Sequence, residues 1–302
     1  MADLVVVGSV ALDTVTTPFG AVTEALGGAA TYFSYSASFF TQVRLVGTVG
    51  EDFPSEHLDL LRHRHVDLAG LQISKGRTFR WTGEYGYDLN EAKTLDTQLN
   101  VFADFKPALP EAYKAAPFLF LANIDPVLQL DVRRQMTRTD LVALDTMNFW
   151  IQGKRDDLLR ALAEVDALLI NDAEARQLAG EPNLVKAARA ILRLGPRTIV
   201  VKRGEYGALM LSEDEVFFVP AYPLESVFDP TGAGDTFAGG FMGYLSSQGK
   251  VDRQSVRRAI VYGSVMASFT VEDFSLDRLK RLTPEDVQRR YGAFHDLVRV
   301  DL

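Results

Sequence analysis

Short apolar runs recur along the chain, and each has the length and composition of a buried strand. The first, at residues 4–7, is rich in β-branched side chains and ends at Gly8. Runs of the same kind return at residues 118–124, 141–145, 167–171 and 197–202. Stretches with helical spacing lie between them, for example at residues 156–165 and 183–194. This alternation at βαβ length predicts an α/β fold, with a central, mostly parallel sheet and helices on both faces.

One region departs from this rhythm and alternates apolar with polar residues. Residues 78–85 and 95–101 both show a period of two, which is typical of half-exposed strands. The polar residues 87–94 between them suit a connecting loop. We therefore expect a small β-sheet over about residues 72–105, with residues 10–20 as a candidate addition. It would be an appendage of a single domain spanning residues 1–302, and could serve as a lid, as a homodimer contact or as both.

The last third of the chain turns from strands to helices. Two short strands are expected at residues 209–211 and 216–219, around an acidic turn. Residues 255–270 have helical spacing, and Thr283 followed by Pro284 indicates an N-cap and a first helical position. No internal repeat or low-complexity linker divides the sequence.

Composition narrows the classes of partner. Among 302 residues, 32 Lys and Arg stand against 40 Asp and Glu, a net charge of −8 without a basic stripe, which disfavours nucleic acid. The apolar runs are far shorter than the ~20 residues of a membrane helix. Cysteine is absent, so disulfides and thiolate chemistry are excluded. Met1 leads straight into a strand-like run, so we expect a cytoplasmic protein without a signal peptide.

The most informative stretch is residues 229–241. Gly232, Ala233 and Gly234 run directly into a helical pattern, and bare amides at a helix start form a binding site for an anion. Asp235 lies within this cluster, where its charge would repel a bound anion. The residues alone leave two interpretations open. Asp235 could act as a base beside a transferring phosphoryl group, or it could simply cap the helix.

The run Asp229-Pro-Thr-Gly-Ala-Gly-Asp-Thr-Phe-Ala-Gly-Gly resembles the C-terminal signature of the ribokinase-like (PfkB) family of carbohydrate and nucleoside kinases. The resemblance implies a ribokinase-like fold with a β-sheet lid. It also implies that Asp235 is the catalytic base and that Gly232, Ala233 and Gly234 form the anion hole. The expected reaction is transfer of the γ-phosphoryl group of ATP to a hydroxyl of a small sugar, polyol or nucleoside.

Other residues match the same family in the same order and imply a substrate site. Gly27 and Gly28 correspond to the glycine pair that approaches the sugar, and Asp13 to the carboxylate that holds substrate hydroxyls. Tyr32 and Asn123 are further candidates for substrate binding. Each also has a structural explanation, because paired glycines usually form turns and Asp13 could be an ordinary turn residue.

A second set of matches implies a nucleotide site. Asn171 and Glu174 resemble the family's Asn-x-x-Glu element, which is associated with Mg²⁺ and phosphate, so Glu174 would act on the metal indirectly. Lys202, Gly204 and Gly207 resemble the turn that contacts nucleotide phosphates. Alternatively, Asn171 and Glu174 could be capping residues of a helix, and Lys202 a solvated charge at a strand end.

Departures from the family pattern concern the substrate and a monovalent ion. Ala29 and Tyr32 replace the Lys and Asn of ribokinase-type enzymes, so ribose is doubtful, and Tyr32 would suit stacking on a ring or narrowing of the site. Phe79, Trp81 and Tyr85 on one face of the lid could cover a base or form a dimer contact. Asp229 and Thr231 resemble the start of a K⁺ site, but residues 272–274 replace the expected Gly-Ala segment, which leaves K⁺ dependence open.

Competing functions find less support. The spacing of Gly243 to Lys250 is wrong for a P-loop, and the residues after Gly8 lack a dinucleotide-binding glycine pattern. The four histidines have no spacing typical of a metal site. A sugar kinase is favoured, and an adenosine-type nucleoside kinase is the first alternative. The other class is an inactive binding or regulatory protein, against which the complete Gly-Ala-Gly-Asp element argues.

Overall fold

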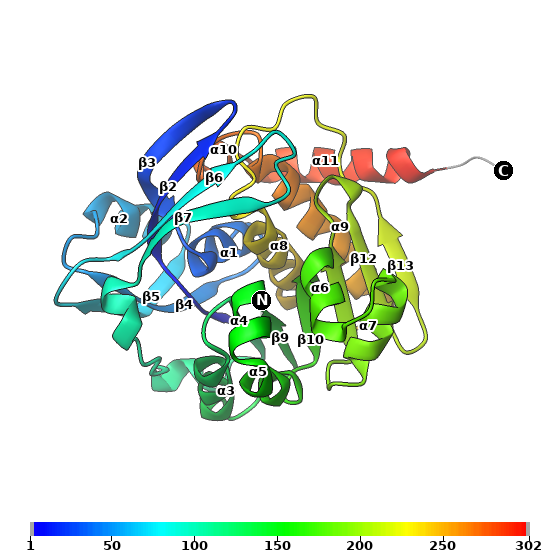
Figure 1. Ribbon diagram of the computed structural model, residues 1–302, viewed down its shortest axis with the longest axis horizontal. Coiled ribbons are helices and arrows are strands. Elements are labelled where there is room, and N and C mark those ends of the chain that lie inside the picture. Colours follow the sequence, from blue (N-terminus) through cyan, green and yellow to red (C-terminus); the bar gives the residue numbers. More distant parts are fainter. Residues whose placement is uncertain (1–2, 300–302) are drawn as a thin grey trace.

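The computed structural model describes residues 3–299 as a large sheet between two layers of helices, with a smaller sheet beside it (Figure 1). The large sheet has the order β13-β12-β11-β10-β9-β8-β1-β4-β5 and is parallel from β11 to β5. β12 and β13 add an antiparallel edge. The strands are β1 (Leu4–Val7), β4 (Val43–Gly50), β5 (Val66–Ser74), β8 (Phe118–Leu121), β9 (Leu141–Asp145), β10 (Ala167–Asn171), β11 (Thr198–Lys202), β12 (Ala208–Ser212) and β13 (Val216–Val219).

Helices cover both faces, as the sequence predicts. In β1, Leu4 and Val6 join one hydrophobic core while Val5 and Val7 join the other, because successive strand residues point to opposite faces. The first core includes α1 (Ala29–Ala37), α2 (Ser55–His63), α8 (Ala233–Gln248), α9 (Arg253–Thr270), α10 (Asp277–Lys280) and α11 (Pro284–Val298). The second includes α3 (Pro126–Gln135), α4 (Asn148–Gly153), α5 (Arg155–Leu162), α6 (Asp172–Ala179) and α7 (Leu184–Leu192).

The smaller sheet combines two hairpins that are distant in sequence, in the order β3-β2-β6-β7. β2 (Ala11–Thr17) and β3 (Gly20–Gly27) form the first hairpin, and β6 (Phe79–Tyr85) and β7 (Ala92–Gln98) the second. In Figure 1 this sheet lies at the upper left, in blue and cyan. The described sheet therefore extends past residue 20, to Gly27.

The structure also corrects several boundaries. Residues 72–74 belong to β5 of the large sheet, and residues after Asn100 form the 3₁₀ helix η1 (Asn100–Asp104), so neither is part of the small sheet. β7 begins at Ala92, which shortens the expected loop to residues 86–91. β4 and β5 lie outside the strand runs expected from sequence. Further 3₁₀ turns are η2 (Glu111–Tyr113) and η3 (Gly204–Tyr206).

Parallel strands bring their carboxyl ends to one edge of the sheet, where α/β proteins bind ligands. Three chemically active side chains lie at such ends, namely Asp145 on β9, Asn171 on β10 and Lys202 on β11. Asn171 is the direct sheet neighbour of Lys202. Within residues 3–299, no helix is long and apolar enough to span a bilayer.

Candidate active site

The glycine-rich stretch forms a tight turn into helix α8. Gly232 is the N-cap and has φ of 72°, a left-handed conformation that glycine adopts without strain. The ring of Tyr32 packs against it, since a Cβ on Gly232 would lie 2.4 Å from ring carbons. Ala233 and Gly234 begin the helix at its positive end, where the Ala233 N–H donates to the Pro230 carbonyl at 3.1 Å. We call residues 232–234 the anion turn.

Asp235 is in the first turn of α8 and is half-buried. Gly232 has no side chain to cap the helix, and within residues 3–299 no cap hydrogen bond from a side chain is present there. The pKa of Asp235 is raised to about 7, mainly by burial and also by the Asp145 carboxylate, while Lys202 acts in the opposite direction. The carboxylate is thus available for proton transfer and is not engaged as a cap.

Lys202 and Asp145 form an ion pair behind this carboxylate, with 2.8 Å between Nζ and Oδ2. Burial alone would lower the pKa of Lys202, but Asp145 and Asp235 outweigh burial and raise it. Lys202 also lies against the anion turn, because a Cβ on Gly234 would be 3.0 Å from its Nζ. The ammonium is therefore charged and directed at the place where an anion would bind.

Asp145 is a site residue that sequence reasoning missed. It is 4% exposed, and its Oδ1 accepts a hydrogen bond from the backbone N–H of Thr146. The sequence signal that could have identified it is its position as the last residue of a buried parallel strand. A single such carboxylate is not distinctive without knowledge of which strand lies beside it.

Asn171 and Glu174 form the capping box of α6. The Glu174 N–H donates to Asn171 Oδ1 at 2.7 Å, and the Asn171 N–H donates to Glu174 Oε2 at 3.0 Å. The structural interpretation of this pair is thus correct, yet Glu174 also faces the ion pair. The pKa of Glu174 is raised to about 7. Burial is the main cause, Asp145 adds to the rise, and Lys202 opposes it.

A divalent cation would need ligands beyond the protein. Within residues 3–299, no group of three or more His, Asp or Glu side chains is arranged to hold a metal ion. Mg²⁺ commonly binds through one or two carboxylates together with substrate phosphates and water. Glu174 and Asp145 fit such a shared site, in which the nucleotide would supply the remaining ligands.

Asp13, on β2, is 6% exposed and lies close enough to Asp229 and Asp235 for both carboxylates to affect its pKa. Its Oδ2 accepts the Gly28 N–H at 3.4 Å. A Cβ on Gly27 would lie 1.9 Å from that oxygen, so only glycine fits there. Burial raises the pKa of Asp13 to about 7, even though the Gly28 hydrogen bond lowers it. Asp229 and Asp235 add smaller upward effects.

The two remaining substrate candidates have protein partners. Tyr32 is 2% exposed, and Gly232 covers one face of its ring, so the ring supports the anion turn in a way the sequence did not suggest. Asn123 follows β8, and its Oδ1 accepts the Trp150 Nε1–H at 2.9 Å. This bond fixes the orientation of the Asn123 amide.

The aromatic residues of the small sheet separate into different roles. Phe79 stacks on Phe102, with 5.4 Å between ring centroids, and the Trp81 Nε1–H donates to Thr94 at 3.2 Å. Tyr85 reaches Thr231, the residue before the anion turn, whose hydroxyl donates to the Tyr85 oxygen at 3.4 Å. Burial raises the pKa of Tyr85 to about 12. The small sheet thus contributes both Asp13 and Tyr85 to the site.

Asp229 joins two segments behind the anion turn. Its Oδ1 accepts the Thr231 N–H at 2.9 Å, and its Oδ2 accepts the Ser275 N–H at 3.3 Å. Burial raises the pKa of Asp229, and the bonds from Thr231 and Ser275 oppose this rise. Glu272, in the segment that departs from the family pattern, pairs instead with Arg278 and Arg290.

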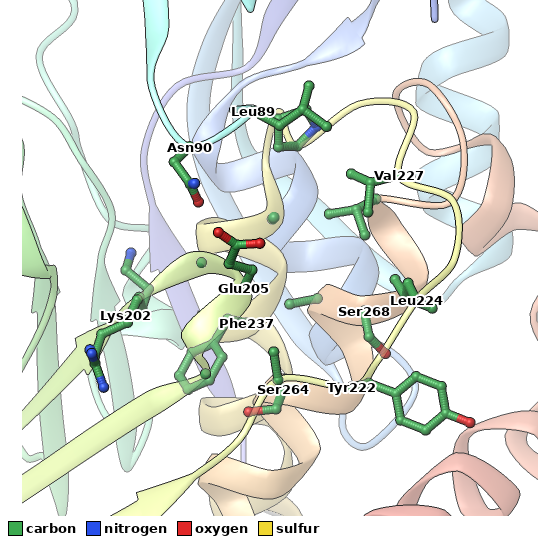
Figure 2. Close-up of a pocket in the computed structure, with 18 of the residues that line it drawn as sticks. Leu89, Asn90, Lys202, Glu205, Tyr222, Leu224, Val227, Phe237, Ser264 and Ser268 are labelled. Carbon is green, nitrogen blue, oxygen red and sulfur yellow. The ribbon is translucent and has the colours of Figure 1, made fainter. Parts of the chain in front are cut away.

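A cavity of about 530 Å³ opens beside the anion turn (Figure 2). Lys202, Gly204 and Gly207 line it at one end together with Ala233 and Gly234. Asn171 and Glu174 are not among its lining residues. Apolar side chains also line it, among them Phe237, Ala267 and Val271, and Figure 2 shows Leu224 and Val227 on the side opposite Lys202. One end thus suits phosphates and the other a flat, apolar group.

Comparisons with known proteins show the family of this chain. The family model for pfkB family carbohydrate kinases matches residues 1–278. A cytidine kinase from Thermococcus kodakarensis is 34% identical over 267 residues, which are 85% of this chain and 93% of that protein. A nucleoside kinase from Methanothermobacter thermautotrophicus is 27% identical over 256 residues, 82% of this chain and 78% of that protein.

Solved structures share the fold. The nucleoside kinase of Methanocaldococcus jannaschii, described as an archaeal member of the ribokinase family, aligns with a TM-score of 0.77 at 19% identity. The alignment covers 97% of this chain and 99% of that one. Since one family model spans both the strand that holds Asp13 and the helix that holds Asp235, the chain is a kinase of the pfkB family of carbohydrate kinases.

Proposed function

We propose that this kinase phosphorylates a nucleoside, with ATP as donor and Mg²⁺ as the divalent ion. Sequence alone favoured a sugar and kept a nucleoside as the alternative. Two relatives that align over most of the chain are named for cytidine and for nucleosides, which favours the alternative. The departures at Ala29 and Tyr32 from the ribokinase pattern agree with an acceptor other than free ribose.

Asp235 carries the phosphoryl-transfer part of the proposal, because it is a carboxylate of raised pKa that directly follows the anion turn. A base whose pKa lies near the working pH can accept a proton from an attacking hydroxyl efficiently. Asp13 would hold neighbouring hydroxyls of the acceptor. The amides of the anion turn and the Lys202 ammonium would stabilise the charge of the transferring phosphoryl group.

The cavity would hold the nucleotide. Its charged end, at Lys202 and the anion turn, suits the phosphates, and its apolar end between residues 221–227 and α9 suits a purine ring. Mg²⁺, shared between the phosphates and Glu174 or Asp145, would neutralise phosphate charge. Bound in this way, the nucleotide would present its terminal phosphate toward Asp235.

The test is ADP release with Mg²⁺ and ATP against nucleosides, pentoses, hexoses and inositols at equal concentration. We expect the highest kcat/KM with a nucleoside, and cytidine should be the first compound tried. A sugar as the best acceptor would move the assignment to a sugar kinase. No turnover with any acceptor, in protein that binds ATP, would favour the inactive binding protein.

A monovalent ion at Asp229 and Thr231 stays a prediction. Asp229 is 1% exposed, and no Lys or Arg of residues 3–299 forms an ion pair with it. A buried carboxylate without such a partner is better stabilised when a cation lies nearby. We expect faster ADP release in KCl than in choline chloride at equal ionic strength, whereas equal rates would argue against the ion.

A further inference from the structure

The loop between β6 and β7, residues 86–91, extends beyond the acceptor side of the site. Tyr87, Asp88, Leu89 and Asn90 all line the same cavity as Lys202 and the anion turn. Figure 2 shows Leu89 and Asn90 at the rim of this cavity, with Asn90 on the side of Lys202 and Glu205. One hairpin of the small sheet therefore borders both halves of the site.

Asn90 touches the turn that follows Lys202. A Cβ on Gly204 would lie 2.4 Å from Asn90 Oδ1, so the side-chain amide rests directly on the Gly204 backbone. The loop itself fixes this amide, because Asn90 Nδ2 donates to the Asp88 carbonyl at 2.9 Å and Asn90 N donates to Asp88 Oδ1 at 3.2 Å. A side-chain amide has two N–H donors, and this bond uses one of them.

We propose that residues 87–90 are part of the nucleotide site, with the second N–H of Asn90 donating to a phosphate oxygen. The proposal rests on the assignment of the cavity to ATP. The same hairpin carries Tyr85, whose oxygen accepts from Thr231 beside the acceptor site. Acceptor and nucleotide would thus share one closing element, and each would bind more tightly in the presence of the other.

Two variants test the loop. Asn90→Ala removes only the amide. The second replaces residues 86–91 with Asn-Gly, a two-residue turn that keeps Tyr85 paired with Ala92. We expect Asn90→Ala to raise the KM for ATP about 10- to 100-fold, as for loss of one hydrogen bond to a charged group. The shortened loop should raise it further and, because it removes the coupling, should also raise the KM for the acceptor at saturating ATP. Asn90→Ala should leave the KM for the acceptor within about twofold.

Calorimetry with Mg·ADP separates this proposal from the assignment of function. Wild-type protein should bind ADP more tightly with acceptor present, and the shortened loop should lose most of this gain. Gln98→Ala, on the exposed far end of the same hairpin, is the matched control and should behave as wild type. Wild-type values for both loop variants, in both measurements, would overturn the proposal even if nucleoside kinase activity is present.

Discussion

Two charged groups, Asp145 and Lys202, act in opposite directions on the pKa of Asp235. The Asp145 carboxylate favours the protonated acid, and the Lys202 ammonium favours the carboxylate. Because these two groups are themselves paired at 2.8 Å, their effects partly cancel, and burial decides the outcome. The result is a base with a pKa near neutrality, which suits proton transfer in this pH range.

Replacing Asp235 by Asn should remove the base and keep the shape of the side chain. We expect kcat to fall by about 10²–10⁴-fold, the usual contribution of general acid–base catalysis. ADP binding, measured by calorimetry, should stay near the wild-type value because the anion turn and Lys202 are unchanged. A variant that kept most of its rate would exclude Asp235 as the base.

Replacing Asp145 by Asn should move the pH dependence in a known direction. The base must be ionised to act, so kcat/KM for the acceptor should rise with pH with a midpoint near the pKa of about 7. Without the Asp145 charge the pKa of Asp235 falls, and the midpoint should move to lower pH. Asp140→Asn removes an exposed carboxylate beside the other end of β9 and should leave the midpoint unchanged. A midpoint that stays in place or rises in Asp145→Asn would contradict the coupling.

Candidate site residues that are adjacent in the sequence could be identified from the sequence alone. Gly232 to Asp235 are adjacent in the chain, and their small side chains and helical continuation indicate the anion turn directly. Asp145 gave no such signal, because its place in the site depends on its ion pair with Lys202, which lies two strands away in the sheet. Tyr32 was identified, but its contact with Gly232 depends on how α1 packs against α8.

At the scale of elements, helix α11 packs against residues that line the cavity. Arg290 of α11 lies over the rings of Phe269 and Tyr222, at 3.5 and 4.7 Å from their centroids. It also donates to Ser268 at 3.1 Å and pairs with Glu272 at 2.6 Å. Tyr222 and Ser268 both line the cavity, so a helix that does not itself carry Asp235 contacts two of its lining residues.

Arg290→Met should therefore weaken nucleotide binding. We expect the free energy of unfolding to fall by about 1–2 kcal/mol, from lost cation–π and ion-pair contacts. The KM for ATP should rise by about three- to tenfold, while the KM for the acceptor changes little. The matched control is Arg289→Met on the same helix, whose side chain is 74% exposed. If both variants show the same KM for ATP, α11 does not position the cavity.

Elements with one strong local pattern were predictable, and elements that depend on tertiary contacts were not. β8, β9, β10 and β11 are continuous apolar runs and agree with the expected strands. β4 contains Gly47 and Gly50, whose missing side chains admit the backbone of Gly8 and of residues 76–78. These glycines interrupt the apolar pattern of β4, although close packing requires them.

For the whole molecule, the relation between the two sheets rests on a small polar network. Arg80 of the small sheet pairs with Glu24 of β3 in the same sheet at 2.7 Å and, across to the large sheet, with Asp52 at 2.9 Å. Asp52, which follows β4, also accepts the backbone N–H and the hydroxyl of Thr78, each at 2.7 Å. Sequence indicated both sheets, but not this junction, because Asp52 is 26 residues away from Thr78.

Arg80→Met should loosen the small sheet without removing any group from the site itself. Arg80 is 13% exposed, and Asp52 would keep its bonds from Thr78, so the fold should survive with a loss of about 1–2 kcal/mol. Because Asp13 and Tyr85 both belong to this sheet, the KM for the acceptor should rise by about fivefold, in proportion to a loss of about 1 kcal/mol.

Arg77, three residues before Arg80, offers a control for this junction. Arg77 is 62% exposed and lies 3.9 Å from the same carboxylate of Asp52, so Arg77→Met removes an equal charge but little contact. It should leave the acceptor KM unchanged, whereas Arg80→Met should also speed proteolytic cleavage within residues 86–91. Equal behaviour of the two variants would mean that the strand pairs alone orient the small sheet, and that Arg80 only neutralises charge.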